Sequence, residues 1–176
     1  LSLLIEAPII MLLTASTKLT RDLDSYRKLW KFTIFSGGSL SALHLLVAIT
    51  SRFDFVAGNL LGVKGDVLES SRLGMIIMTP WTFAIAHRRF NQGILIRFGQ
   101  SKAVGWGTLV RLAADAIVLF TCFGLAPALK SNSIGIIAAT AAVSAGVLAE
   151  AAYAAWRVRP IVRNILPNIK STEPPI

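Results

Sequence analysis

The stretch FTIFSGGSLSALHLLVAITS, residues 32–51, decides the fold class, because twenty consecutive residues carry no formal charge. A helix needs about 20 predominantly apolar residues to cross a hydrocarbon core of roughly 30 Å. Four other segments approach this requirement, at 1–17, 67–90, 104–126 and 134–156. We therefore predict an all-α fold: a polytopic membrane helix bundle of about five transmembrane helices over residues 1–160, followed by a cytoplasmic tail over 161–176.

The composition supports a membrane protein. The chain is 54% hydrophobic and 15% charged, against roughly 45–50% and 25% in soluble domains. Its net charge of +9 comes from basic residues that cluster between the apolar runs, a pattern typical of membrane proteins and not of nucleic-acid-binding surfaces. The single cysteine, Cys122, has no second thiol, so we expect neither a disulfide nor a cysteine metal site.

Lysine and arginine are distributed unevenly between alternate connections. Thirteen lie between the first and second spans, between the third and fourth, and after the fifth, whereas three lie in the opposite connections. Because basic loops stay in the cytoplasm, we predict that loops 18–31 and 87–103 and the tail after Trp156 face the cytoplasm, across the plasma (inner) membrane. Arg88 and Arg89 would then form a cytoplasmic gate at the inner boundary. Apolar residues beyond them favour a long third helix over a segment lying along the inner interface.

Ionisable residues inside predicted spans are functional hypotheses by default, because a charge near the bilayer centre costs about 2.5–3.5 kcal/mol. The candidates are Glu6, Glu69, Arg72, Arg111, Asp115 and Glu150. Arg111 and Asp115 are four residues apart, and Glu69 and Arg72 are three apart, so each pair shares a helix face and can neutralise itself. Arg111 and Glu150 lie at matching depths in consecutive antiparallel spans, so we predict that they interact. Such a pair either fixes helix register or lines a polar cavity or ion-coupling site.

Two further residues interrupt the apolar pattern. His44, in the otherwise uncharged second span, either hydrogen-bonds to a neighbouring helix or relays protons. Pro80, in the third span, should bend the helix and free a backbone carbonyl that a neighbouring helix or water must satisfy. The bend is either a tolerated kink or a hinge. The last span is dense in small residues, which predicts close helix packing.

Three stretches carry a family resemblance: EAPIIMLLTASTKLTRDLDSYRKLWKFT (6–33), TPWTFAIAHRRFNQGILIRFGQSKAVGWGTLVRL (79–112) and GVLAEAAYAAWRVRP (146–160). In their order, in the spacing between spans and in the basic turns, they resemble one lobe of the MATE-like transporters. That superfamily also includes the exporters of drugs, lipid-linked oligosaccharides and polysaccharides, and the chain looks most similar to its progressive-ankylosis-type branch. The resemblance covers most of the chain, although no single motif is diagnostic.

The resemblance implies a transporter of two six-helix lobes with a central cavity that opens alternately to each side. Parallel repeats need an even number of spans, so five spans predict one missing helix, most simply before Leu1. The expected partners are the bilayer, the missing span and second lobe, a small-molecule or lipid-linked substrate, and a coupling proton or sodium ion.

Two other functions are considered beside transport: a polytopic enzyme acting on a lipid, and a small membrane scaffold. The sequence contains no P-loop, no HExxH, no nucleophile elbow and no acidic Mg²⁺ cluster. We therefore expect no enzymatic activity, no cofactor and no metal. Charges placed inside spans favour a transporter over a scaffold.

Overall fold

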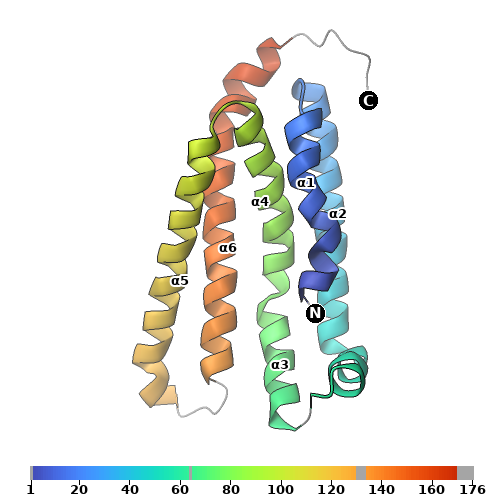
Figure 1. Ribbon diagram of the computed structural model, residues 1–176, viewed down its shortest axis with the longest axis vertical. Helices are drawn as coiled ribbons and strands as arrows, with labels where there is room; N and C mark the ends of the chain where they lie inside the picture. The colour runs from blue at the N-terminus through green and yellow to red at the C-terminus, as the bar shows by residue number, and fades with distance from the viewer. Residues whose placement is uncertain (1, 64, 130–133, 170–176) are drawn as a thin grey trace.

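The computed structural model describes residues 2–63, 65–129 and 134–169, and of residues 2–7 and 125–129 only the backbone. Within these ranges there are helices and no strands. The α-helices are α1 (Ser2–Leu19), α2 (Leu23–Ile49), α3 (Asp66–Ile77), α4 (Thr79–Arg97), α5 (Ser101–Leu129) and α6 (Ile134–Pro160). Short helices follow α2 (η1, Asp54–Leu60) and α6 (η2, Ile161–Ile165; η3, Leu166–Asn168). The helices lie side by side in one elongated bundle (Figure 1), so the predicted all-α fold is confirmed.

The surface of the bundle is apolar, as a membrane requires. The described parts of α2, α5 and α6 are each long and apolar enough to cross a bilayer. Large hydrophobic side chains point outward from them; Phe35 is 75% exposed and Phe120 is 79% exposed. Exposed apolar area on this scale is unfavourable in water. The protein is therefore a helical membrane bundle.

The first and third predicted spans differ from this simple pattern. Helix α1 begins partway along the bundle, and its described apolar part, Pro8–Leu19, is shorter than the other spans. The third span is divided into α3 and α4, which run end to end (Figure 1). Helix α4 continues to Arg97, which confirms the long helix in preference to an interfacial segment. Hydropathy alone does not identify α3 or α4 as a span.

Helix α2 starts earlier than the predicted apolar boundary at residue 32. The Ser25 amide donates to the Asp22 carboxylate at 2.8 Å, and the Ser25 hydroxyl accepts from the Asp22 amide at 3.0 Å. This capping box satisfies amides that the first helical turn leaves unpaired. The basic residues of segment 27–31, which the sequence predicted to lie in a loop, therefore belong to the first turns of helix α2.

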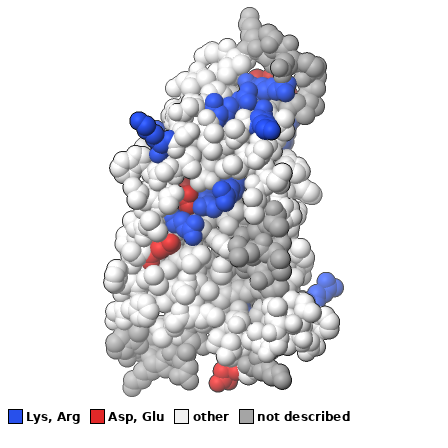
Figure 2. Space-filling view, viewed as in Figure 1, with Lys and Arg blue, Asp and Glu red and all other residues white. Residues whose placement is uncertain are grey.

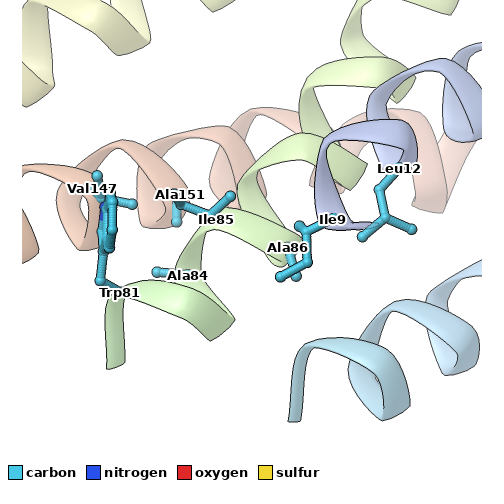
Figure 3. Packing of buried hydrophobic residues seen from close by; sticks show 8 residues of the cluster. All are labelled: Ile9, Leu12, Trp81, Ala84, Ile85, Ala86, Val147 and Ala151. Carbon is cyan, nitrogen blue, oxygen red and sulfur yellow. The ribbon is translucent and has the colours of Figure 1, made fainter. Parts of the chain in front are cut away.

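Helix α4 is the centre of the bundle and contacts α1, α2 and α6. Figure 3 shows one core cluster in which its side chains meet those of α1 and α6. The members of that cluster are Ile9, Leu12, Trp81, Ala84, Ile85, Ala86, Val147 and Ala151. Gly93 brings α4 close to α1, because a Cβ there would collide with the Ser16 hydroxyl and the Leu13 carbonyl.

The chain after α6 packs against the end of the bundle. Ile161 and Leu166 are fully buried in a second core cluster with Phe90, Ile94 and Leu95 of α4. The first residues of segment 161–176, predicted to be a tail, therefore extend the core. Residues 170–176 lie outside the described part of the chain.

Candidate functional site

Pro80 stands at the break between α3 and α4. It has no amide hydrogen, so the carbonyl one turn earlier loses its helical partner. The Trp81 amide bonds to the Met78 carbonyl at 3.1 Å instead of continuing the α-helical pattern, which also frees the Ile77 carbonyl. The helix is thus interrupted where the sequence predicted a bend, and a hinge at this position stays a prediction.

Side chains from both neighbouring helices hydrogen-bond to carbonyls around the break. The Ser41 hydroxyl of α2 donates to the Thr79 carbonyl at 2.9 Å. The Ser144 hydroxyl of α6 donates to the Ile77 carbonyl at 3.4 Å. Neighbouring helices therefore supply the partners that a broken helix needs inside a membrane.

His44 bridges α2 to both sides of the same break and is fully buried. Its Nε2 lies 2.9 Å from the Met75 carbonyl of α3, and its Nδ1 lies 2.8 Å from the Thr82 hydroxyl of α4. A carbonyl can only accept, so Nε2 carries the hydrogen and donates it. Of the two roles considered for His44, this geometry matches the hydrogen bond to a neighbouring helix.

An ion pair between α4 and α6 lies deep in the bundle. Arg88 donates to Oε2 of Glu150, and their side chains are only 9% and 3% exposed. The amide of Gln92, one turn along α4, donates to Oε1 of Glu150 at 2.9 Å. Both carboxylate oxygens are thus engaged, which a buried charge requires.

Helix α5 adds a second pair beside the first. Arg111 Nε lies 3.7 Å from the Asp115 carboxylate. Gly146 of α6 makes room for them, because a Cβ there would collide with Asp115 and would lie 3.1 Å from Arg111 Cγ. A Cβ at Gly107 would lie 3.4 Å from Glu150 Cγ. Gly146 of α6 and Gly107 of α5 therefore let the two helices approach closely, which brings the α5 charges next to Glu150.

Arg89 completes a set that we call the charge cluster: Arg88, Arg89, Gln92, Arg111, Asp115 and Glu150. Arg89 lies within electrostatic range of Arg88, Arg111 and Glu150. The cluster contains three guanidinium groups and two carboxylates. Three of its buried polar atoms have no hydrogen-bond partner among the described residues: Nε of Arg88, Nε of Arg89 and Oδ1 of Asp115. Figure 2 shows basic and acidic side chains together midway along this face of the bundle.

Two predictions about these charges are corrected. In the described part of the chain, no ion pair joins Arg111 to Glu150; Arg88 pairs with Glu150, and Arg111 pairs with Asp115. Arg88, predicted to belong to a cytoplasmic loop, is buried within the bundle. The apolar run of the third span ends at the paired arginines, whereas helix α4 continues to Arg97. Arg88 and Gln92 are four residues apart, so both side chains lie on the helix face that contacts α6. That spacing was the signal that could have revealed Gln92.

The remaining candidates do not join the cluster. Arg72 pairs with Asp54, not with Glu69, and donates to the Ala48 carbonyl at 3.2 Å at the end of α2. Its position is therefore explained by capping a helix, because a cation is favourable at a helix C-terminus. Glu69 is exposed. The Glu6 side chain lies outside the described residues.

The charge cluster consists of guanidinium groups, carboxylates and one amide, placed inside an apolar bundle. Within the described ranges, no three His, Cys, Asp or Glu side chains gather as metal ligands would. Guanidinium groups, carboxylates and an amide can instead bind a polar or charged solute and exchange ion-pair partners. No protein-family model, no curated protein and no solved structure matches the chain.

Proposed function

We propose that this chain is a lobe of a secondary active transporter or flippase, which moves an organic ion, a drug-like molecule or a lipid-linked sugar by alternating access. The observation that carries the proposal is the charge cluster, which lies between α4, α5 and α6 of a membrane bundle, with Arg88 and Glu150 buried and Arg111 and Asp115 partly exposed. Charged side chains are rare at such depth and mark solute or ion pathways.

The composition of the cluster favours a binding role over a purely structural one. A buried ion pair compensates its desolvation only where its geometry is good and its remaining hydrogen-bonding groups are satisfied. Here the guanidinium groups outnumber the carboxylates, and Nε of Arg89 and Oδ1 of Asp115 are unpartnered among the described residues. Asp115 and Glu150 are the carboxylates that a coupling proton or sodium ion would occupy.

The broken helix supports movement. Arg88, Arg89 and Gln92 all lie on α4, so a tilt of α4 relative to α3 at Met78 would displace them together. The bonds across the break come from side chains of α2 and α6 and do not depend on a continuous helix. Discontinuous helices with sites beside them are a recurring device of secondary transporters.

The exposure of the cluster supports a second lobe. The side chains of Arg111 and Asp115 are 35% and 21% exposed on the surface of the bundle. Facing lipid, they would be unfavourable. A preceding span and a second lobe would enclose them in a polar cavity, as the MATE-like resemblance implies. We further propose that the basic end of the bundle faces the cytoplasm.

The test is transport by the full-length protein that contains this chain, reconstituted in proteoliposomes. A panel of fluorescent organic cations, organic anions and lipid probes would identify the solute. Glu150→Gln and Arg88→Gln should each abolish its saturable uptake. Asp54→Asn is the matched control, because it breaks an ion pair outside the charge cluster, between η1 and α3.

Thermal unfolding of each variant in detergent separates lost function from lost folding. A charge-reversed double variant, Arg88→Glu with Glu150→Arg, restores the ion pair and should recover stability without recovering transport. No transport of any probe by the wild type, or full transport by folded Glu150→Gln, would favour a scaffold role and overturn the proposal.

A further inference from the structure

One end of the bundle is rich in both basic and aromatic side chains. The α1–α2 turn, the α4–α5 turn and the chain after α6 all lie at this end (Figure 1). Trp30 of α2 and Trp156 of α6 are 40% and 58% exposed. Tryptophan is enriched at the level of lipid headgroups. This end therefore has the chemistry of a membrane–water interface.

A groove opens here between α2 and α6, with α4 as its floor. It has a volume of about 370 Å³. Tyr26 and Trp30 of α2 form one wall, Val158 and Arg159 of α6 form the other, and Arg163 of η2 stands at the end. The groove exists because α4 packs against both α2 and α6 and keeps them apart.

Two arginines of this groove have no partner in the part of the chain that the structure describes. Arg159 and Arg163 make no hydrogen bond or ion pair there, whereas Arg157 donates to the Gln100 amide oxygen at 3.3 Å and lies over the Trp156 ring. Both also line a second recess of about 420 Å³, together with Trp156 and Arg157. Two free guanidinium groups four residues apart favour an anion between them.

The depth of the groove indicates what kind of anion it meets. Helix α6 has 27 residues, about 40 Å at 1.5 Å per residue, which exceeds a hydrocarbon core of roughly 30 Å. Its last turns, with Arg159, therefore reach the headgroup layer. The walls formed by Trp30, Val158 and Val162 are apolar or aromatic, and the floor on α4 carries the polar side chains of His87 and Asn91. A ligand that matches this lining has an anionic group beside the arginines and an apolar part along the walls.

We propose that this groove binds an anionic phospholipid. Arg159 and Arg163 hold its phosphate, and one acyl chain lies along Tyr26 and Trp30. Guanidinium groups match phosphate geometry through paired hydrogen bonds, and basic pockets between transmembrane helices are known headgroup sites. A zwitterionic lipid lacks the net negative charge that the two free guanidinium groups require.

The experiment measures lipid binding to the purified full-length protein by native mass spectrometry. Phosphatidylglycerol and phosphatidylcholine of identical chains are titrated in parallel. The protein should bind one molecule of phosphatidylglycerol more tightly than phosphatidylcholine. The double variant Arg159→Gln with Arg163→Gln should weaken the binding of that molecule roughly tenfold or more. The control, Lys18→Gln with Lys102→Gln, removes the same charge from exposed sites outside the groove and should leave binding unchanged.

Two results would overturn the proposal. Equal losses in the groove and control variants would mean diffuse attraction between the basic end and any anionic lipid. Complete displacement by millimolar inorganic phosphate would mean an anion site without a lipid chain. A far-ultraviolet circular dichroism spectrum identical to that of the wild type shows that the groove variant is folded. The variant Trp30→Ala retains both arginines but removes part of the apolar wall, so it should also weaken lipid binding.

Discussion

Replacing Glu150 with glutamine is expected to destabilise the bundle strongly. Glutamine keeps the shape of the side chain and one acceptor oxygen for Gln92, but it removes the negative charge and the second oxygen, which accepts from Arg88. Arg88, whose side chain is 9% exposed, then loses its counter-ion. Breaking a buried pair by removing one partner costs about 3–5 kcal/mol. We expect the lower end, ~3 kcal/mol, because the cluster keeps one carboxylate, that of Asp115, which lies within electrostatic range of position 150.

The free energy of unfolding can be measured by titrating detergent-solubilised protein with dodecyl sulfate and following helicity. Glu69→Gln is the matched control: it removes the same charge from an exposed site and should change stability by no more than about 0.5 kcal/mol. Adding Arg88→Met to Glu150→Gln removes the orphaned cation, so the double variant should recover much of the loss. Equal small effects of Glu150→Gln and Glu69→Gln, or no recovery in the double variant, would refute the buried pair.

Three further predictions concern packing, the break and topology. Gly93→Ala should destabilise the bundle by forcing α1 away from α4, whereas Gly105→Ala, where a Cβ meets nothing, should be neutral or stabilising by about 0.5–1 kcal/mol; unfolding titrations compare the two. His44→Ala should lower the free energy of unfolding by about 1–3 kcal/mol because it orphans the buried Met75 carbonyl, and a stability equal to wild type would exclude the bridge. In a Cys122→Ser background, an impermeant thiol reagent outside intact cells should label a cysteine at Asn59 and spare one at Ser101; the reverse labelling would invert the topology.

Much of the bundle was predictable because helices that face lipid can be recognised from their apolar composition. Segments 32–51, 104–126 and 134–156 are predominantly apolar; α2 contains the first up to Ile49, and α5 and α6 contain the other two. The break at Pro80 was predictable from backbone chemistry alone, because proline removes a donor wherever it stands. These features depend on the sequence of a single segment and not on its packing contacts with other helices.

Helix α4 was harder to predict because it is buried among other helices. Its inward side chains include Arg88, Asn91 and Gln92, and a hydropathy count treats such residues as the end of a span. The partner of Glu150 could not be found from depth alone, since both Arg88 and Arg111 lie near it. Which arginine reaches the carboxylate depends on helix rotation, which only the packed structure defines. The Arg72–Asp54 pair likewise joins residues from different helices.

The central claim is that the charge cluster lines a water-accessible pathway that opens alternately to each side. A cysteine at Ala114, on α5 beside Asp115 and in a Cys122→Ser background, tests it directly with a charged methanethiosulfonate reagent applied from either side of proteoliposomes. A cysteine at Phe120, exposed on the apolar surface of α5, is the control and should not react. Alternating access predicts that the cysteine at 114 reacts from both sides and that saturating solute shifts the ratio of the two rates. A cysteine at 114 that is as unreactive as the one at 120, from both sides and with or without solute, would mean a sealed structural cluster and would contradict the account.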